Sequence, residues 1–229
     1  MGLTIENKKY LEDVLNRGLS QLGLETRQEC NEKVLLYIDE LIIWSNKINL
    51  TAIKIPEDIV IKHFMDSLVC LKEIEEKGAE LLDIGTGAGF PGLPLKIFCP
   101  DISVTLMEAT GKKIRFLEEL LKKLDIDNVS ILHGRAEELA KKEELQAKFD
   151  FVVVRAVGEL RLLTKLSFPF LKKGGRLLAL KGCVIDEEIK KSQKVLEKMN
   201  GAIEKITDYE LISGKKGKLI KIVKGNTNG

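Results

Sequence analysis

The apolar residues of the first 78 positions recur at helical spacing, with no strand-like alternation. One expected helix carries Tyr10, Leu11, Val14, Leu15 and Leu19. A second carries Val34, Leu35, Ile38, Leu41 and Ile42. A third is expected to begin near Pro56, a favourable first-turn residue, and to run toward Lys77-Gly78. Residues 1–78 are therefore predicted to form a helical N-terminal region.

From residue 80 onward, short apolar runs alternate with amphipathic stretches. The expected strands are ELLDIG, SVTLMEA, VSILHG, DFVVVRAV, RLLALKG, KITDYEL and KLIKIVK. Between the second and third strands, residues 112–124 show helical periodicity. Alternating strands and helices predict an α/β fold with a parallel sheet covered on both faces. The last two strands flank a Ser-Gly-Lys-Lys-Gly turn and can pair antiparallel, so residues 79–229 are predicted to form one domain with a mostly parallel, seven-stranded sheet.

Composition narrows the class of protein. The chain is 44% hydrophobic and 31% charged, as is usual for soluble domains. It has no apolar run long enough to span a membrane and its first residues lack the apolar segment of a signal peptide, so we expect a cytoplasmic protein without a membrane partner. The four cysteines are scattered and no His/Cys group has metal-ligand spacing, which favours free thiols and no metal site.

The small net charge of +2 is unevenly distributed. Residues 1–78 hold 10 Lys/Arg against 14 Asp/Glu, and the remainder holds 27 against 21. The C-terminal segment from residue 214 to 229 contains no acidic residue. Its five lysines are Lys215, Lys216, Lys218, Lys221 and Lys224. Such a run is commonly a solvated face, but within a basic half of the chain it is also suited to nucleic-acid phosphates.

The segment Leu81 to Gly92, LLDIGTGAGFPG, fits two ligand-binding patterns at once. Its end fits the G-x-G-x-x-G loop of dinucleotide-binding folds, while Asp83-x-Gly85-x-Gly87-x-Gly89 is typical of a loop that holds S-adenosylmethionine. Glu108 ends the next strand, where a carboxylate can accept hydrogen bonds from the ribose hydroxyls of either cofactor. The Asp83 carboxylate favours the cationic sulfonium over a pyrophosphate, and the chain is short for a dehydrogenase, so S-adenosylmethionine is preferred.

Several further motifs accompany this loop in order along the chain. They are Trp44, Asn49-Leu50-Thr51, Lys62-His63-x-x-Asp66-Ser67, Lys112-Lys113-x-x-Phe116-Leu117, Arg135-Ala136-Glu137-Glu138, Arg155-Ala156 and Lys181-Gly182. Together with the loop, this set resembles the RsmG (GidB) family of bacterial methyltransferases, which modify N7 of a guanine in small-subunit ribosomal RNA. The resemblance implies a Rossmann-like class I methyltransferase fold, S-adenosylmethionine as cofactor, and 16S rRNA or the small ribosomal subunit as partner.

The resemblance also implies roles for individual residues. Gly85 and Phe90 would line the cofactor, and Ala136 and Glu137 would border its adenine. Arg155 would end the fourth strand at the cleft between cofactor and substrate, as a cofactor-binding residue and the candidate catalytic residue. From the residues alone, Glu137 could instead be an exposed first-turn carboxylate. Arg155, in an apolar strand, could instead form an ion pair with a helix carboxylate. His63 is equally suited to a core hydrogen bond and to a ligand contact.

Four functions are compatible with these features. The first is an rRNA guanine-N7 methyltransferase, which needs no general base because guanine N7 already carries a lone pair. The others are a small-molecule methyltransferase, a noncatalytic RNA-binding module, and an NAD-dependent oxidoreductase. The sequence shows no aromatic stacking signature for RNA and gives no indication of the oligomeric state.

Overall fold

The computed structural model of the chain describes residues 3–74, 76–155 and 158–225. Both helices expected near the N-terminus are confirmed, as α1 (Ile5–Leu22) and α2 (Gln28–Ser45). The Thr4 side chain accepts a hydrogen bond from the backbone N–H of Asn7 and caps the start of α1, and Gly23 ends this helix with a left-handed φ of 69°. Ala156 of the Arg155-Ala156 motif lies outside the described residues.

The third helical segment begins at Pro56, as expected, but it is not one regular helix. It consists of α3 (Pro56–Ile59), the π-helical η1 (Val60–Met65), α4 (Asp66–Leu68) and the 3₁₀ turn η2 (Val69–Glu73). The expectation that it continues toward Lys77-Gly78 was wrong: the helical segment ends at Glu73, and Ile74 leaves helical geometry with φ −109° and ψ 85°. π-turns within helices occur frequently at functional sites, and this one carries His63.

The seven expected strands are confirmed and form one sheet in the order β3-β2-β1-β4-β5-β7-β6. They are β1 (Glu80–Ile84), β2 (Ser103–Glu108), β3 (Val129–His133), β4 (Phe149–Arg155), β5 (Leu171–Lys181), β6 (Gly201–Glu210) and β7 (Lys216–Lys224). The pairings of β1 through β5 are parallel, and β7 pairs antiparallel with both β5 and β6. The order reverses between β1 and β4, which is where open α/β sheets bind their ligands.

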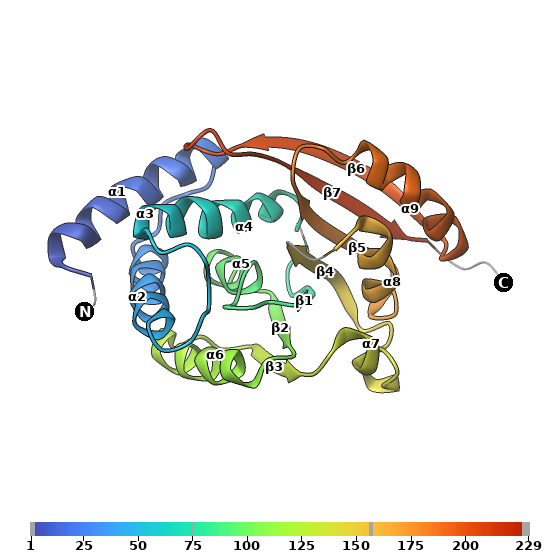
Figure 1. Cartoon of the computed structure of the whole chain (residues 1–229), viewed down its shortest axis with the longest axis horizontal. Helices are drawn as coiled ribbons and strands as arrows, with labels where there is room; N and C mark the ends of the chain where they lie inside the picture. The colour runs from blue at the N-terminus through green and yellow to red at the C-terminus, as the bar shows by residue number, and fades with distance from the viewer. Residues whose placement is uncertain (1–2, 75, 156–157, 226–229) are drawn as a thin grey trace.

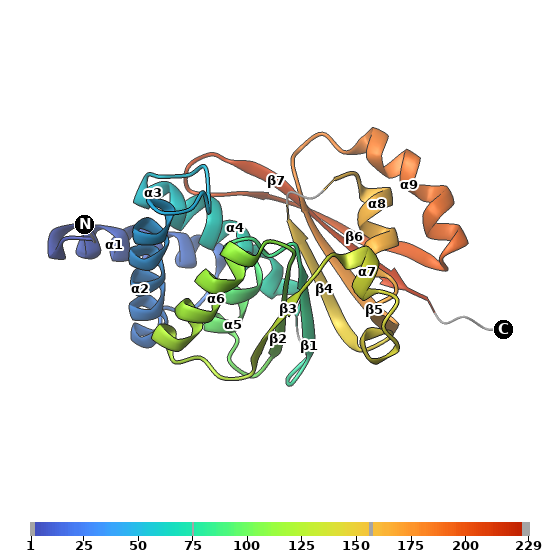
Figure 2. The same cartoon turned by 60° about the horizontal axis from the view of Figure 1, so that its bottom comes forward.

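Helices cover both faces of this sheet, which makes a three-layer α/β fold. Figures 1 and 2 show the helices α1 to α6 on one face and α7 to α9 on the other. The connecting helices are α5 (Gly92–Phe98), α6 (Gly111–Leu124), α7 (Ala136–Leu139), the 3₁₀ turn η3 (Glu143–Leu145), α8 (Leu160–Ser167) and α9 (Asp186–Lys198). The helix expected over residues 112–124 is thus confirmed as α6.

Strand alternation explains why there are two hydrophobic cores. Leu81 faces the core beneath α1 to α6, whereas its neighbour Leu82 faces the core beneath α8. Leu15 of α1 and Tyr37 of α2 belong to the same core as Leu81, so the N-terminal helices pack directly on the sheet. The division of the chain at residue 78 into two parts coincides with the connection into β1 and stays a prediction.

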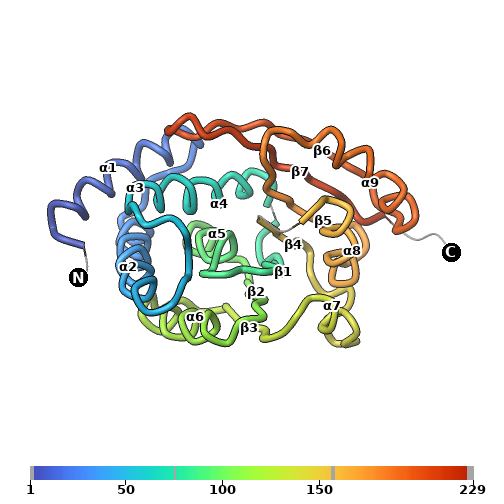
Figure 3. The backbone as a smooth tube through the Cα atoms, viewed as in Figure 1, coloured from blue at the N-terminus to red at the C-terminus, as the bar shows by residue number. Residues whose placement is uncertain are grey.

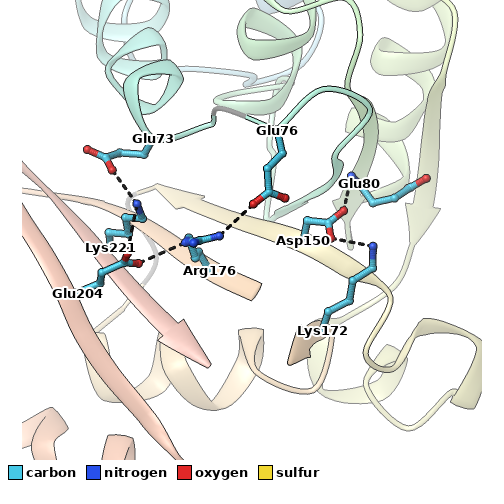
Figure 4. A network of polar contacts seen from close by, with 8 residues as sticks. All are labelled: Glu73, Glu76, Glu80, Asp150, Lys172, Arg176, Glu204 and Lys221. Carbon is cyan, nitrogen blue, oxygen red and sulfur yellow. Dashed lines mark hydrogen bonds and ion pairs between the residues drawn. The ribbon is translucent and has the colours of Figure 1, made fainter. Parts of the chain in front are cut away.

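Ion pairs join the N-terminal helical segment to the far edge of the sheet (Figure 4). The buried Glu73 accepts hydrogen bonds from Lys205 of β6 at 2.7 Å and Lys221 of β7 at 3.0 Å. Arg176 of β5 bridges Glu76 and Glu204. Figure 3 shows the β6–β7 hairpin running along the α4 segment despite their distance in sequence. Within the described ranges, no helix is both long enough and apolar enough to cross a membrane.

Candidate active site

The sheet brings several of the expected site residues to one edge. Gly85 directly follows β1, Glu108 is the last residue of β2, and Arg155 is the last residue of β4. The parallel register pairs Ile84 with Met107, so the glycine loop and Glu108 start from neighbouring strand ends. This edge is the carboxyl end of the parallel strands, where the sequence placed the cofactor.

The glycines of the loop differ in what they tolerate. Gly85, Gly87 and Gly89 all have positive φ, of 71°, 62° and 98°. A Cβ on Gly87 would meet no atom closer than 3.9 Å, so space lies open beside this backbone. A Cβ on Gly89 would instead collide with the Tyr37 hydroxyl and with Leu93. The ligand-approach argument therefore applies to Gly87, whereas internal packing is sufficient to require glycine at 89.

The Glu108 carboxylate is fastened to the same loop. Its Oε2 accepts a hydrogen bond from the Gly87 N–H at 3.0 Å, and its Oε1 accepts one from the Thr110 N–H at 2.8 Å. The Lys113 ammonium lies 3.8 Å away, and Glu108 is only 6% exposed. Each carboxylate oxygen has a second lone pair, so the side chain can still accept from ribose hydroxyls. That role for Glu108 stays a prediction.

Asp83 lies beneath the loop and is fully buried. Its Oδ2 accepts hydrogen bonds from the Thr86 hydroxyl at 2.6 Å and from the Gly92 N–H at 2.8 Å. Burial raises the pKa of this carboxyl to about 6, although both hydrogen bonds and Arg155 favour the charged form. In the structure Asp83 fixes the two ends of the loop, a contribution that the sequence pattern did not indicate.

Arg155 forms the ion pair that the sequence left as an alternative. Its Nη1 lies 3.6 Å from Oδ2 of Asp66 in α4 and donates to the carbonyls of Lys62 and His63 in η1, both at 3.3 Å. Its Nη2 lies 2.8 Å from Nδ1 of His63. The side chain is 14% exposed and lines a cavity. Arg155 therefore forms the ion pair and still faces a space that a ligand can enter.

His63 has both ring nitrogens occupied. Because arginine can only donate, Nδ1 accepts from Arg155, and Nε2 therefore carries the proton and donates to the Thr51 hydroxyl at 2.8 Å. Burial first, and then the charges of Arg155 and Lys215, lower the pKa of His63 to about 3. The imidazole is thus neutral at physiological pH. Its hydrogen bonds agree with the internal role that the sequence left open, but His63 also lines a cavity, so a contact with RNA or cofactor stays a prediction.

Phe90 connects the loop to this polar group. Its ring stacks on His63 at 4.6 Å and on Tyr37 at 5.0 Å between centroids, and the Arg155 guanidinium lies 5.2 Å from its centre. Phe90 is only 4% exposed. The glycine loop is therefore packed against the N-terminal helices, and a contact between Phe90 and the cofactor stays a prediction.

The two residues after β3 differ in exposure. Ala136, the first residue of α7, is buried, and Glu137 beside it is exposed in the first turn. Glu137 is therefore placed so that it can accept a hydrogen bond from the edge of the adenine. It can equally be a solvated carboxylate that is stabilised by the start of a helix. The cofactor role of Ala136 and Glu137 stays a prediction.

The C-terminal lysines are not simply a solvated face. Lys215 pairs with Asp66, Lys216 with Glu210, and Lys218 with Asp208. Lys221 pairs with Glu73, and the Lys224 ammonium donates to the carbonyls of Phe168 and Leu171. The sequence suggested an uncompensated run because the compensating groups come from other segments.

A cavity of about 320 Å³ adjoins Arg155. It is lined by η1 and α4, by the ends of β4 and β5, and by the β6–β7 hairpin. Tyr209 of β6 is a cavity residue that the sequence did not indicate; its hydroxyl donates to Asp66 at 2.8 Å. No local pattern could have identified it, because Tyr209 and Asp66 are 143 positions apart. Among the described residues, no group of three His, Cys, Asp or Glu side chains is placed to hold a metal ion.

Comparison with known proteins identifies similar chains. A family model described as rRNA small subunit methyltransferase G (GidB) matches residues 30–213. The ribosomal RNA small subunit methyltransferase G of Desulforamulus reducens is 44% identical over 189 residues, covering 82% of this chain and 79% of that protein. The protein of the same name from Clostridium novyi is 39% identical, covering 90% of this chain and 86% of its own length.

Solved structures support the fold. A SAM-dependent methyltransferase from Aquifex aeolicus superposes with a TM-score of 0.52 at 20% identity, covering 69% of this chain and 89% of that one. The M1A22 tRNA methyltransferase TrmK of Bacillus subtilis gives a TM-score of 0.55 at 17% identity, covering 72% and 67% of the two chains. At these identities the likeness concerns the fold alone, and it confirms the Rossmann-like methyltransferase architecture expected from the sequence.

Proposed function

Because the chain belongs to the rRNA small subunit methyltransferase G family, we propose that it transfers the methyl group of S-adenosylmethionine to N7 of a guanine in 16S ribosomal RNA. The substrate is the rRNA itself or the small ribosomal subunit. Residues 79–229 form the cofactor-binding domain in this proposal, and residues 1–78 complete it. Work on ribosomal RNA is consistent with a cytoplasmic protein.

The observation that carries this proposal is the coupling of Glu108 to the glycine loop. A buried carboxylate at the end of β2 holds the N–H of Gly87, beside backbone that leaves room for a ligand. This arrangement fits the adenosine part of S-adenosylmethionine, with the ribose at Glu108 and the adenine toward Ala136 and Glu137. The family membership favours methyl transfer over a nicotinamide-dependent reaction, over a small-molecule substrate and over a noncatalytic role.

When bound, S-adenosylmethionine supplies an electrophilic methyl group. The N7 lone pair of guanine can attack it without prior loss of a proton, so this chain has to position the two reactants rather than provide a base. Gly85 and Gly87 allow close approach of the cofactor, and Asp83 holds the loop in place through Thr86 and Gly92. The neutral His63 is consistent with a site that needs no proton transfer.

Arg155 is the proposed catalytic residue on the substrate side. Its guanidinium is held by Asp66 and His63 at the end of β4, facing the cavity. It cannot donate to both O6 and N7 of the target guanine, because N7 has to face the methyl group. A single contact to O6 or to the nucleotide's phosphate leaves N7 free and orients the base.

The decisive experiment is tritium transfer from labelled S-adenosylmethionine to deproteinised rRNA and to small ribosomal subunits, followed by mapping of the modified base. We expect label at one guanine N7 in at least one of the two substrates. Calorimetry with S-adenosylmethionine and with NAD provides the control. Binding of NAD without S-adenosylmethionine, or label confined to small molecules, would contradict the proposal.

A further inference from the structure

We propose that the cavity next to Arg155, called here the hairpin cavity, binds a phosphate group of the RNA substrate. The inference rests on the proposed function and adds the place where this chain holds the RNA backbone. The walls come from η1, α4, the ends of β4 and β5, and the β6–β7 hairpin. Figure 1 shows these elements side by side around the end of the sheet.

Positive charge dominates the lining of the hairpin cavity. Five cationic side chains border it: Lys62, Arg155, Lys181, Lys215 and Lys216. Among the described residues that line the cavity, Asp66 is the one with a carboxylate. Cations from four separate segments therefore converge on a space of about 320 Å³, which favours an anionic group.

Asp66 organises these cations rather than neutralising them all. It is 3% exposed, and its Oδ1 accepts from the Tyr209 hydroxyl at 2.8 Å and from the Lys215 ammonium at 2.7 Å. Its Oδ2 lies 3.6 Å from Arg155. An ammonium has three donors and a guanidinium five, so Lys215 and Arg155 keep further hydrogens for a second anion. The buried carboxylate thus holds donors from β4 and the hairpin in place before RNA binds.

Lys62 and Lys216 are held by partners that water can reach, whereas Lys181 is 12% exposed and pairs with Glu188 at 2.7 Å. Lys62 pairs with Asp58 at 2.9 Å and Lys216 with Glu210 at 3.3 Å, and the two carboxylate side chains are 29% and 54% exposed. Ion pairs of this kind contribute little, because water and salt compete for both groups. Exchange of such a carboxylate for a phosphate therefore costs little.

The position of the hairpin cavity favours an RNA phosphate over the carboxylate of the cofactor. The cavity lies at the ends of β4 and β5, whereas the glycine loop and Glu108 follow β1 and β2. His63, one of its lining residues, stacks on Phe90 of the loop, so the two places adjoin. Phosphate contacts position a nucleic acid on a protein without reading its sequence. A phosphate in the cavity would fix the backbone next to the nucleotide that reacts.

The sequence motifs give independent support. The glycine loop explains neither Lys62-His63-x-x-Asp66 nor Lys181-Gly182, although both segments stood out in the sequence. The structure brings both to the hairpin cavity.

The test measures binding of a labelled 16S rRNA fragment to the S-adenosylmethionine-loaded protein by fluorescence anisotropy at several salt concentrations. The variants are Lys62→Met in η1, Lys215→Met in the turn of the hairpin, and the double variant. Lys218→Met is the matched control, because Lys218 lies on the same hairpin, loses the same charge, and pairs with Asp208 outside the cavity lining. Thermal unfolding verifies that each variant is folded.

We expect each cavity variant to weaken RNA binding roughly three- to tenfold, and the double variant to reduce the salt slope by about 0.7, as for one lost phosphate contact of a single strand. Because both lysines would hold one phosphate, the double variant should weaken binding by less than the product of the single effects. The control and all S-adenosylmethionine affinities should stay at the parental value. Parental RNA binding and salt slope in folded cavity variants would overturn the inference, as would a loss confined to cofactor affinity. Absence of rRNA methylation by the parent would instead count against the proposed function.

Discussion

Three charged residues at the strand ends show how partners determine a side chain's role. Glu108 accepts hydrogen bonds from one N–H in the loop after β1 and from one N–H just after β2. Asp83 is buried under the loop, and Arg155 is anchored by Asp66. All three were candidates from the sequence. Their hydrogen bonds differ: Asp83 holds the loop together, whereas the cofactor role of Glu108 and the substrate role of Arg155 stay predictions.

Glu108→Ala should weaken S-adenosylmethionine binding by about 1.5–3 kcal/mol, because it removes a charged acceptor for the ribose and releases the Gly87 N–H. Isothermal titration calorimetry gives the affinity. Glu118→Ala, an exposed change on α6, is the control and should bind like the parent. Parental affinity in Glu108→Ala would remove this carboxylate from the cofactor site.

His63 should make stability depend on pH. Its folded pKa of about 3 lies below the ordinary value of 6.5, so its contribution is complete above pH 6.5 and is lost as pH falls toward 3. Between pH 6 and pH 4 the free energy of unfolding of the parent should fall more steeply than that of His63→Gln, by up to about 1.4 kcal/mol per pH unit. Urea unfolding across this range measures both slopes, and parallel curves would show that His63 ionises normally.

At the scale of elements, the loop after β1 is supported from two directions. Asp83 bonds to both of its ends from below, and Phe90 packs it against α2 and η1 through Tyr37 and His63. A segment rich in glycine is conformationally costly to order, so these contacts are needed to hold one conformation. The irregular helical segment from Pro56 to Glu73 is therefore part of the site and not only a cover for the sheet.

Two substitutions distinguish the glycine that leaves room for a ligand, Gly87, from the glycine that is required by internal packing, Gly89. Gly87→Ala has space for its Cβ and should cost the fold only about 1 kcal/mol for its positive φ, while cofactor affinity falls. Gly89→Ala should lower the free energy of unfolding by more, about 2 kcal/mol or above, because Tyr37 and Leu93 occupy the space. Denaturant unfolding and calorimetry on both variants test this order, and a more stable Gly89→Ala than Gly87→Ala would contradict it.

At the scale of the whole molecule, long-range ion pairs tie the N-terminal helices to the C-terminal hairpin. Glu73 sits at the centre of one such group, between Lys205 and Lys221 (Figure 4 shows Glu73 with Lys221). Burial raises the pKa of Glu73, but the hydrogen bonds from the two lysines outweigh it and hold the pKa below the ordinary value. The hairpin is thereby fixed against the segment that carries His63 and Asp66.

Glu73→Ala should therefore lower the free energy of unfolding by about 1–3 kcal/mol, because a buried acceptor and its charge are lost opposite two lysines. The matched control is Glu76→Ala in the same network, whose side chain is 54% exposed and whose loss should cost no more than about 1 kcal/mol. Chemical denaturation at neutral pH measures both. Equal effects of the two substitutions would mean that the burial of Glu73 adds nothing to the stability of the fold.

The sequence by itself determined the elements and the cofactor loop. The periodicities that predicted α1, α2, α6 and the seven strands are local, since they arise from which face of each segment is buried. The motifs from Trp44 to Lys181-Gly182 were likewise sufficient to indicate the family, and the comparison with known proteins confirmed it. Chain order and parallel pairing then placed Gly85, Glu108 and Arg155 at one edge of the sheet.

Only the tertiary structure decided the partners of the charged groups. Lys215 and Lys221 appeared uncompensated because their partners Asp66 and Glu73 lie 149 and 148 positions away in the sequence. For the same reason the sequence showed neither the burial of Asp83 nor the hydroxyl of Tyr209 on Asp66. Hydrophobic periodicity records whether a residue faces the core, whereas the strength of a charge interaction depends on distance and burial, which exist only once distant segments have packed together.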